Sequence, residues 1–414
     1  MPAPPSRAAA SGVGQPRNEG SPEGTFLFVL PWDLGAIGGV SQVVRALISE
    51  LGQTGLLEPA LLVNSWEDAR PRSSTEGGFR RTFLRVPSPL GETGASAVHG
   101  LKYALTLPWR LAALRAFARG SRVRVVNIHF PTPSALTWFL ARAIGGPNYR
   151  IALSLHGLEV RSTFGMRNME RRLWSWMLRR ADHVIACSDG LRDEVTREYS
   201  LPHGRVTTIH NGIDPAHIER TRDSAPPRVP LPRPYLCNVG TFEPKKAHDV
   251  LLRAFSAFVS ENSEVDLVLI GRDGETSSMT RALIKELGLT ERVHILENLP
   301  HAQTLDLMAG AQAFVLASRI ESFAICLLEA GALSLPVVAT DICGVGELID
   351  DHETGRLVPT EDPAELARVM LEVAQDPAQR QRLGAALRRH VGQQFSWSLA
   401  ARRYLELAAG QKAT

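Results

Sequence analysis

Short apolar runs alternate along the chain with longer segments in which apolar residues recur every three to four positions. Apolar runs of this length are typical of buried parallel strands, and the longer pattern is typical of helices that cover a sheet. In the first half of the chain, strands are expected at residues 26–31, 59–64, 82–86, 123–130, 150–156, 183–187 and 206–210. This alternation predicts an α/β domain with a mostly parallel sheet.

A proline-rich segment interrupts the pattern at residues 224–234, where five of eleven residues are proline. Because proline lacks a backbone donor and stiffens the chain, this segment is interpreted as a linker. The alternation then restarts, with strands expected at 235–240, 265–271, 293–296, 313–318 and 336–340. The predicted organisation is a disordered segment at 1–24, a Rossmann-like domain at 25–223, the linker at 224–234, a second Rossmann-like domain at 235–394, and a terminal helix at 395–414.

The length of 414 residues is consistent with two hydrophobic cores. Residues 1–24 are rich in Pro, Ala, Ser and Gly and lack the apolar core of a secretory signal, so they are expected to be disordered. No run of 18 apolar residues occurs, and no membrane span is expected. The four cysteines have no paired spacing, which favours free thiols in a reducing cytosol over disulfides or zinc; they are Cys187, Cys237, Cys326 and Cys343.

The net charge of +3 conceals an asymmetry. Through Asp223 the chain carries 27 Lys and Arg against 19 Asp and Glu, and the remainder carries 19 against 24. One basic cluster, at residues 161–180, is interleaved with methionine and tryptophan. It fits either a helix lying on an anionic bilayer or a core helix with a solvated arginine face. No nucleic-acid-binding motif accompanies the charge, so a nucleic-acid partner is not expected.

Two glutamates, Glu321 and Glu329, stand eight residues apart around an expected strand-to-helix turn. Eight helical residues span about 12 Å, so the two carboxylates suit opposite ends of one extended ligand such as a nucleotide-sugar. Glutamates near a helix start are also favoured by the helix dipole, so the spacing alone is a weak signal. The apolar strands on both sides place Glu321 at the carboxyl end of a parallel strand, where open α/β sheets bind ligands.

The run from Phe314 to Glu347 resembles the donor-site signature of the retaining family-4 glycosyltransferases, which have the GT-B fold. The resemblance covers roughly residues 25–410. It implies two Rossmann-like domains that face a central cleft, with the acceptor on the first and the nucleotide-sugar donor on the second. It also implies that the last helix crosses back to the first domain.

Several roles follow from this resemblance. Glu321 and the backbone of Ser322, Phe323 and Ala324 are expected to contact the donor sugar, and Glu329 to hold the ribose. The family usually has glycine at the position of Ala324 and often at that of Ser322, so both departures add side-chain bulk beside the sugar.

Glycines and lysines after the first strand of each domain are the candidate diphosphate-binding residues. Gly38 and Gly39 open a helix, where backbone amides can approach an anion, although a tight turn also needs glycine. The resemblance places both beside the distal phosphate of the donor. Lys246 aligns with the family lysine, and Thr241 replaces the usual arginine, whose charge Lys245 is expected to supply.

His156 ends an expected strand and resembles the family histidine that orients the reacting sugar; it is predicted to be catalytic in that sense, together with Glu321 and Lys246. His129 ends the preceding strand, and its role is left open. Gly271 and Asn298 close two strands of the second domain and are candidates for the nucleobase pocket. Residues 211–214 are interpreted as a structural turn and helix cap.

No metal-ligand spacing is present, so no metal and no cofactor other than the nucleotide-sugar co-substrate is expected. The resemblance implies that the leaving phosphate oxygen acts as the base for the acceptor hydroxyl. The sequence therefore predicts a cytoplasmic hexosyltransferase, either free or at the inner face of the membrane. It is expected to use a lipid-linked or saccharide acceptor in bacterial cell-surface polysaccharide or glycolipid assembly. The alternatives are an epimerase or phosphorylase on the same scaffold and a catalytically silent nucleotide-sugar-binding subunit.

Overall fold

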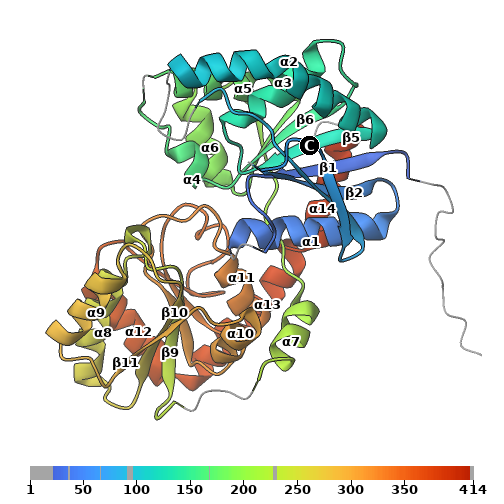
Figure 1. Ribbon diagram of the computed structural model, residues 1–414. Helices are drawn as coiled ribbons and strands as arrows, with labels where there is room; N and C mark the ends of the chain where they lie inside the picture. The colour runs from blue at the N-terminus through green and yellow to red at the C-terminus, as the bar shows by residue number, and fades with distance from the viewer. Residues whose placement is uncertain are drawn as a thin grey trace, which may run out of the picture.

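The computed structural model describes residues 22–35, 38–65, 67–90, 97–166, 168–226 and 231–410. Two sheets, each covered by helices, form two units that lie one above the other in Figure 1. The predicted disordered segment lies almost entirely outside the described residues, as does the middle of the predicted linker. The α/β architecture expected from the alternating pattern is confirmed.

The first sheet has the strand order β3-β4-β2-β1-β5-β6-β7-β8. Its strands are β1 (Thr25–Leu30), β2 (Glu58–Asn64), β3 (Arg72–Glu76), β4 (Phe79–Leu84), β5 (Val123–His129), β6 (Arg150–Leu155), β7 (His183–Ala186) and β8 (Val206–Thr208). All neighbours pair in parallel except β3 and β4, which form an antiparallel edge. Each expected strand is present, and β3 is an additional one.

The second sheet has the order β11-β10-β9-β12-β13-β14 and is parallel throughout. Its strands are β9 (Tyr235–Val239), β10 (Asp266–Gly271), β11 (Val293–Glu297), β12 (Ala313–Leu316), β13 (Val337–Thr340) and β14 (Arg356–Val358). The five expected strands are confirmed, and β14 adds an edge. Strands β9, β10, β12 and β13 are almost entirely buried because helices cover both faces of the sheet.

The helices of the first unit follow the strands at short intervals. They are α1 (Gly39–Thr54), α2 (Ala97–Gly120), η1 (Pro133–Ala135), α3 (Leu136–Ala143), α4 (Leu158–Arg161), α5 (Met169–Arg180) and α6 (Asp189–Glu198). Side-chain caps define several helix starts; for example, Ser188 accepts a hydrogen bond from the Leu191 amide at the start of α6. Loops after β1 and β6 therefore lead directly into helix N-termini.

The remaining helices belong to the second half of the chain. They are α7 (Pro215–Asp223), η2 (Pro244–Lys246), α8 (His248–Glu261), α9 (Ser277–Glu286), α10 (His301–Ala309), α11 (Ile325–Ala332), α12 (Pro363–Gln375), α13 (Pro377–Gln394) and α14 (Trp397–Ala409). Helix α7, which precedes the proline-rich segment, packs against α10 and α11 of the second unit. Helix α14 packs against α1 of the first unit, as Figure 1 shows.

The chain passes between the two units twice, and the two passages lie side by side. The Ile213 amide donates a 2.7 Å hydrogen bond to the Phe395 carbonyl, and Ile213 forms a parallel bridge with Ser396. Gly212 allows this approach, because a Cβ there would lie 2.3 Å from the Trp397 nitrogen. Asp214 then caps α7 by accepting from the Ala216 amide, which agrees with the predicted turn-and-cap role of this segment.

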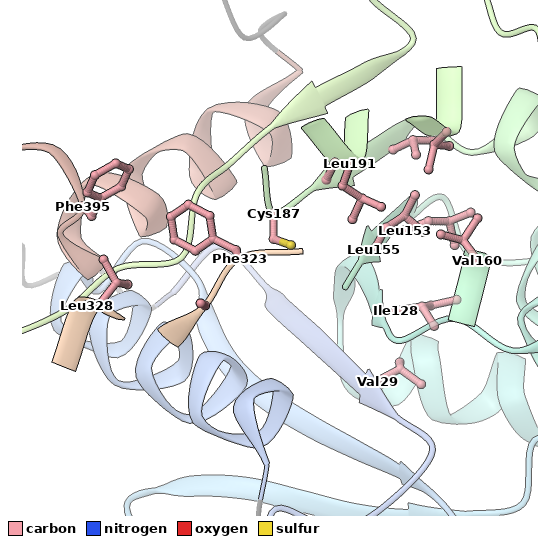
Figure 2. Packing of buried hydrophobic residues seen from close by; sticks show 14 of the residues in the cluster. Val29, Ile128, Leu153, Leu155, Val160, Cys187, Leu191, Phe323, Leu328 and Phe395 are labelled. Carbon is pink, nitrogen blue, oxygen red and sulfur yellow. The ribbon is translucent and has the colours of Figure 1, made fainter. Parts of the chain in front are cut away.

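One hydrophobic core cluster continues across the boundary between the units. Phe323 of the second unit lies with its ring centroid 5.6 Å from that of Phe395, and both belong to the cluster that contains Cys187 and Leu191 of the first unit. Figure 2 shows Phe323 and Phe395 near each other, with Cys187 and Leu191 of the same cluster beside them. Apolar contacts thus join the two units across their boundary.

Candidate functional site

The candidate site lies where the carboxyl ends of the two parallel sheets face each other. The first unit contributes the glycines before α1 and the residue after β6, and the second contributes the segments that follow β9 and β12. Contacts between the units confirm the proximity: a Cβ on Gly39 would lie 3.2 Å from Ile325 Cδ1, at the start of α11. Ligands of open parallel sheets bind at such edges.

Glu321 and Lys246 form an ion pair at this edge. Lys246 Nζ lies 2.6 Å from Glu321 Oε1, and the Ser318 hydroxyl donates to the same oxygen at 2.8 Å. The side chains of Lys246 and Glu321 are only 16% and 12% exposed. Burial lowers the pKa of Lys246, but the neighbouring Glu321 carboxylate outweighs this effect and leaves the pKa above its usual value. A charged lysine is thus held beside the predicted sugar-contacting carboxylate.

Lys245 extends the positive charge of the same turn. Its Nζ lies 2.6 Å from Glu243, and its side chain is one-third exposed. The turn is anchored by Arg319, whose backbone amide donates to the Lys245 carbonyl and whose guanidinium donates to the Pro244 carbonyl. Thr241, at the position of the usual family arginine, is half-buried in the same segment. Two lysines with a fixed backbone suit an anionic ligand such as a diphosphate.

Glu329 lies on α11 and is almost fully buried, with 5% of the residue exposed. One carboxylate oxygen, Oε1, lies 2.8 Å from His301 Nε2 at the start of α10. This hydrogen bond raises the pKa of His301 above its usual value. The predicted ribose-binding carboxylate is therefore oriented by a histidine on a neighbouring helix.

His156 follows β6 and forms part of a buried polar chain. His156 Nε2 lies 3.0 Å from His129 Nδ1, and His129 Nε2 lies 2.9 Å from the amide nitrogen of Asn127. Burial lowers the pKa of His156 to about 4, and burial together with His156 holds the pKa of His129 well below its usual range. Both rings are therefore neutral at physiological pH.

A tight turn after His156 brings the first unit against the donor segment. Glu159 Oε1 accepts from the His156 amide at 2.5 Å, and burial raises the pKa of Glu159 to about 7. Gly157 adopts φ +115°, and a Cβ there would lie 1.9 Å from Ser322 Oγ. Arg161 Nη1 donates to the same hydroxyl at 2.8 Å. Ser322 therefore links the two units directly beside the predicted sugar site.

Glu347 makes a second contact between the units. Its two carboxylate oxygens accept from the Asp189 and Gly190 amides at 2.8 Å each, and Oε2 lies 2.9 Å from His210 Nε2. A carboxylate is favourable at a helix N-terminus, here that of α6. In the described part of the chain, Asp189, His210 and Glu347 are the one set of three whose potential ligand atoms lie within 4.8 Å of one another. Each member already has a hydrogen-bond partner, because the Asp189 carboxylate accepts from the Thr208 hydroxyl at 2.6 Å and Glu347 contacts His210. Metal independence stays a prediction.

The two candidates for the nucleobase pocket lie together. The Asn298 amide donates to the Gly271 carbonyl at 2.9 Å, and Asn298 has a positive φ of 56°. Gly271 packs against the turn after β9, since a Cβ there would lie 2.0 Å from the Gly240 carbonyl oxygen. Both residues follow strand ends at the same sheet edge as Glu321.

A cavity of about 880 Å³ opens between α6, β8 and the α13–α14 junction. Its lining includes His210 and Glu347 but none of the predicted catalytic residues. Phe323, whose ring stacks on His210 at 5.2 Å between centroids, belongs to the core instead of the cavity wall. This cavity is therefore distinct from the candidate donor site.

The predicted residues come together as two groups, with Glu321, Lys246 and Ser322 in one and His156 in the other. Four further residues were not anticipated: Ser318, His301, Glu159 and Arg161 orient the predicted ones by hydrogen bonds. His301 directly follows a strand-end loop, so the rule that sites form at carboxyl ends could have singled it out. Ser318, Glu159 and Arg161 do not belong to any sequence pattern that would have identified them.

Two family models match the chain in consecutive halves. The model for "Glycosyltransferase Family 4" matches residues 37–217, and that for "Glycosyl transferases group 1" matches residues 219–390. Together they span every strand of the two sheets except β1, and every residue of the candidate site.

Curated relatives agree with this family. The chain is 33% identical over 233 residues to D-inositol 3-phosphate glycosyltransferase from Streptomyces avermitilis, a match that covers 53% of this chain and 50% of the relative. It is 26% identical over 297 residues to N-acetyl-alpha-D-glucosaminyl L-malate synthase from Bacillus anthracis, covering 71% and 75%. The match to the first of these spans about half the length of the relative.

Solved structures share the architecture over nearly the whole chain. Sucrose-phosphate synthase from Thermosynechococcus elongatus superposes with a TM-score of 0.71 at 21% identity, covering 93% of this chain and 98% of that one. An Anabaena protein in complex with UDP-glucose gives a TM-score of 0.68 at 18% identity, covering 93% and 99%.

Two Rossmann-like units with facing carboxyl edges define the GT-B fold, which confirms the predicted fold class. Within that fold class, the chain belongs to the family-4 glycosyltransferases.

Proposed function

We propose that the chain transfers a hexosyl group from a nucleotide-diphosphate sugar to an acceptor hydroxyl, with retention of configuration. The observation that carries the proposal is the Lys246–Glu321 ion pair at the carboxyl edge of the second sheet. In this proposal Lys246 provides a positive charge for the negative charge that develops on the departing diphosphate, and the adjacent Glu321 carboxylate contacts the sugar. The UDP-glucose complex of the structurally similar Anabaena protein is consistent with this type of donor.

In this proposal the second unit holds the donor. Glu329, oriented by His301, binds the ribose, while Gly271 and Asn298 border the base. Lys245, Lys246 and the amides of Gly38 and Gly39 bind the diphosphate when the units close. A leaving phosphate oxygen takes the proton of the acceptor hydroxyl, so neither a protein base nor a metal is required.

The first test is Glu321→Gln, which keeps the volume of the side chain but removes its charge. We expect turnover to fall at least about a hundredfold, the size of effect seen when one electrostatic contact to a transition state is lost. Nucleotide binding, measured by thermal shift with UDP, GDP, ADP and CMP, should persist. Glu291→Gln is the control because Glu291 is exposed and precedes β11, at the opposite end of that strand from the candidate site. Unchanged turnover in Glu321→Gln would exclude the assigned role.

Turnover measurements with and without an acceptor distinguish the alternative functions. A nucleotide-sugar epimerase would convert the donor without an acceptor, and a phosphorylase would require inorganic phosphate. A catalytically silent subunit would bind nucleotide but show no turnover with any acceptor. Transfer that depends on both a nucleotide-sugar and an acceptor hydroxyl would support the proposed reaction.

We also propose that the first unit contacts an anionic membrane at its inner face, as lipid-linked or cell-surface saccharide acceptors would require. No helix in the described residues is long and apolar enough to span a bilayer. Helix α2 instead exposes an apolar stripe at helical spacing, formed by Val98, Leu101, Leu105 and Trp109, each more than 60% exposed. Lys102 is exposed on the same helix. Such a combination fits an interfacial helix.

Helix α5 carries part of the basic cluster of residues 161–180. It has one buried face, as expected for a core helix, and exposed apolar residues, as expected for a helix on a membrane surface. Trp174 and Met177 are buried, whereas Met169 and Trp176 are exposed. Arg171 is engaged by Glu198 and Arg179 by the Tyr199 carbonyl, so only part of the cluster is available to a membrane.

The membrane proposal is tested by flotation with vesicles that contain phosphatidylglycerol. Trp109→Ala together with Leu105→Ala should reduce the bound fraction severalfold, because about 1.5–3 kcal/mol per large apolar side chain is lost. Met279→Ala is the matched control, since Met279 is 69% exposed on α9 of the second unit. Equal binding by all three proteins, or no binding by the wild type, would contradict the proposal.

A further inference from the structure

A continuous chain of buried polar groups links the terminal helix to the candidate site. It begins at Tyr404 of α14, whose hydroxyl lies 3.2 Å from Ser154 Oγ on β6. Ser154 contacts Asn127 on β5, Asn127 contacts His129, and His129 contacts His156, which directly follows β6 at the carboxyl edge of the first sheet. Ser154, Asn127 and His129 are at most 2% exposed, so each contact is made without competing water.

The hydrogen bonds of this chain have a definite direction. The Ser154 hydroxyl donates to Asn127 Oδ1 at 2.8 Å, which turns the amide nitrogen of Asn127 toward His129. That nitrogen can only donate, so His129 Nε2 must accept at 2.9 Å. A neutral imidazole with an accepting Nε2 carries its proton on Nδ1, and His129 Nδ1 therefore donates to His156 Nε2 at 3.0 Å.

The same logic fixes the last ring. His156 accepts at Nε2, so its own proton resides on Nδ1 when the ring is neutral. Among the described residues, none makes a hydrogen bond to Nδ1, and His156 is half-buried, in contrast to the fully buried His129. Nδ1 of His156 is thus an available donor, on the residue directly before the Gly157–Ser322 contact.

We propose that Asn127 and His129 are positioning residues that hold His156 in its Nδ1–H tautomer, so that His156 donates a hydrogen bond to a sugar oxygen in the cleft. The role in sugar orientation rests on the proposed glycosyl transfer, but the tautomer itself does not. Reversal of the Asn127 amide would invert every hydrogen bond and turn His156 into an acceptor. An Nδ1–H donor can bind any sugar oxygen, including a ring oxygen that only accepts, whereas an accepting Nδ1 can bind only a hydroxyl.

The direct test is NMR of the full-length protein labelled with 15N-histidine, without ligand, using two-bond proton–nitrogen correlations. His156→Gln identifies the His156 signals by their disappearance. We expect Nδ1 of His156 to show the shift of a protonated nitrogen and Nε2 that of an unprotonated one. Exposed His203 serves as an internal reference for a ring with no imposed tautomer. Protonation of His156 at Nε2 would overturn the proposal whether or not the protein transfers sugar.

Two variants then distinguish the effect of hydrogen-bond direction on the His156 tautomer from the effect of side-chain packing. Asn127→Leu preserves the volume but removes the donor to His129, and it should give a mixture of His156 tautomers. Tyr404→Phe deletes a hydroxyl from the same chain but leaves the Ser154–Asn127–His129 order intact, so the tautomer should not change. If glycosyl transfer is established, Asn127→Leu should lower kcat about three- to tenfold, the effect of one neutral hydrogen bond, with nucleotide affinity unchanged. A single Nδ1–H tautomer retained in Asn127→Leu would show that Asn127 does not set it.

Discussion

At the scale of single residues, the basic side chains of the candidate donor site already have carboxylate partners before any ligand binds. Lys246 contacts Glu321, Lys245 contacts Glu243, and His301 contacts Glu329. An incoming diphosphate must therefore share or displace these carboxylates. This arrangement keeps buried charges paired in the free protein, and it explains why Glu321 cannot be treated as an isolated carboxylate.

Glu159 gives a residue-scale prediction about pH. Burial raises its pKa to about 7, compared with 4.5 for an unperturbed glutamate, so between these values the folded protein keeps a proton that the unfolded chain loses. This contribution to stability is complete below about pH 4.5 and is lost as the pH rises through 7. Glu159→Gln removes this pH dependence. Between pH 4.5 and 8, the free energy of unfolding of the variant should therefore rise by roughly 3 kcal/mol relative to that of the wild type.

Urea denaturation of both proteins at pH 5, 6, 7 and 8 measures this difference. Glu291→Gln, an exposed substitution of the same kind, should follow the wild type at every pH. Parallel stability curves for the wild type and Glu159→Gln would show that Glu159 is ionised in the folded protein.

At the scale of elements, the sequence pattern identified the buried strands well because burial on both faces demands continuous apolar runs. Strand β3 was not predicted from the sequence, because all five of its residues are polar or charged. They are exposed at the sheet edge, where no core constrains them. Helix α11 begins at Ile325, after an extended Ala324. The segment Ser322–Ala324 therefore lies before the helix, and its backbone amides are not part of the helical hydrogen-bond pattern.

The candidate site was predictable only as far as topology determines it. Strand-end positions placed Glu321, Lys246 and His156 at facing edges, as the parallel sheets require. Pairings between distant loops were not predictable, because Lys246 and Glu321 stand 75 positions apart and their contact depends on side-chain packing. The same holds for the hydrogen bond from Arg161 to Ser322, which joins the two units.

At the scale of the whole molecule, the contact between α6 and the loop after β13 predicts how the units depend on each other. A Cβ on Gly190 would lie 2.2 Å from Cys343 Sγ across the boundary. Gly190→Ala should therefore weaken the contact by about 1–3 kcal/mol, the usual cost of overpacking, although alanine favours the helix itself. Turnover should fall because the two halves of the site separate.

The double variant Gly190→Ala with Cys343→Gly is the control for this prediction, because it removes the sulfur that the new methyl group would meet. It should recover most of the stability and turnover, measured by thermal unfolding and by initial rates. Full activity and stability of Gly190→Ala alone would mean that the two units are not in contact there during turnover.

The paired passages at Ile213 and Phe395 have a mechanical consequence. Two polypeptide segments joined by a hydrogen bond form a short ribbon, which bends easily across its flat face but resists stretching and sideways displacement. The two segments thereby act as a hinge, and one unit moves against the other mainly by a single rotation about it. A substrate that closes the cleft then needs to order only one degree of freedom, so less of its binding energy is spent on arranging the two halves and more remains for the reacting bond.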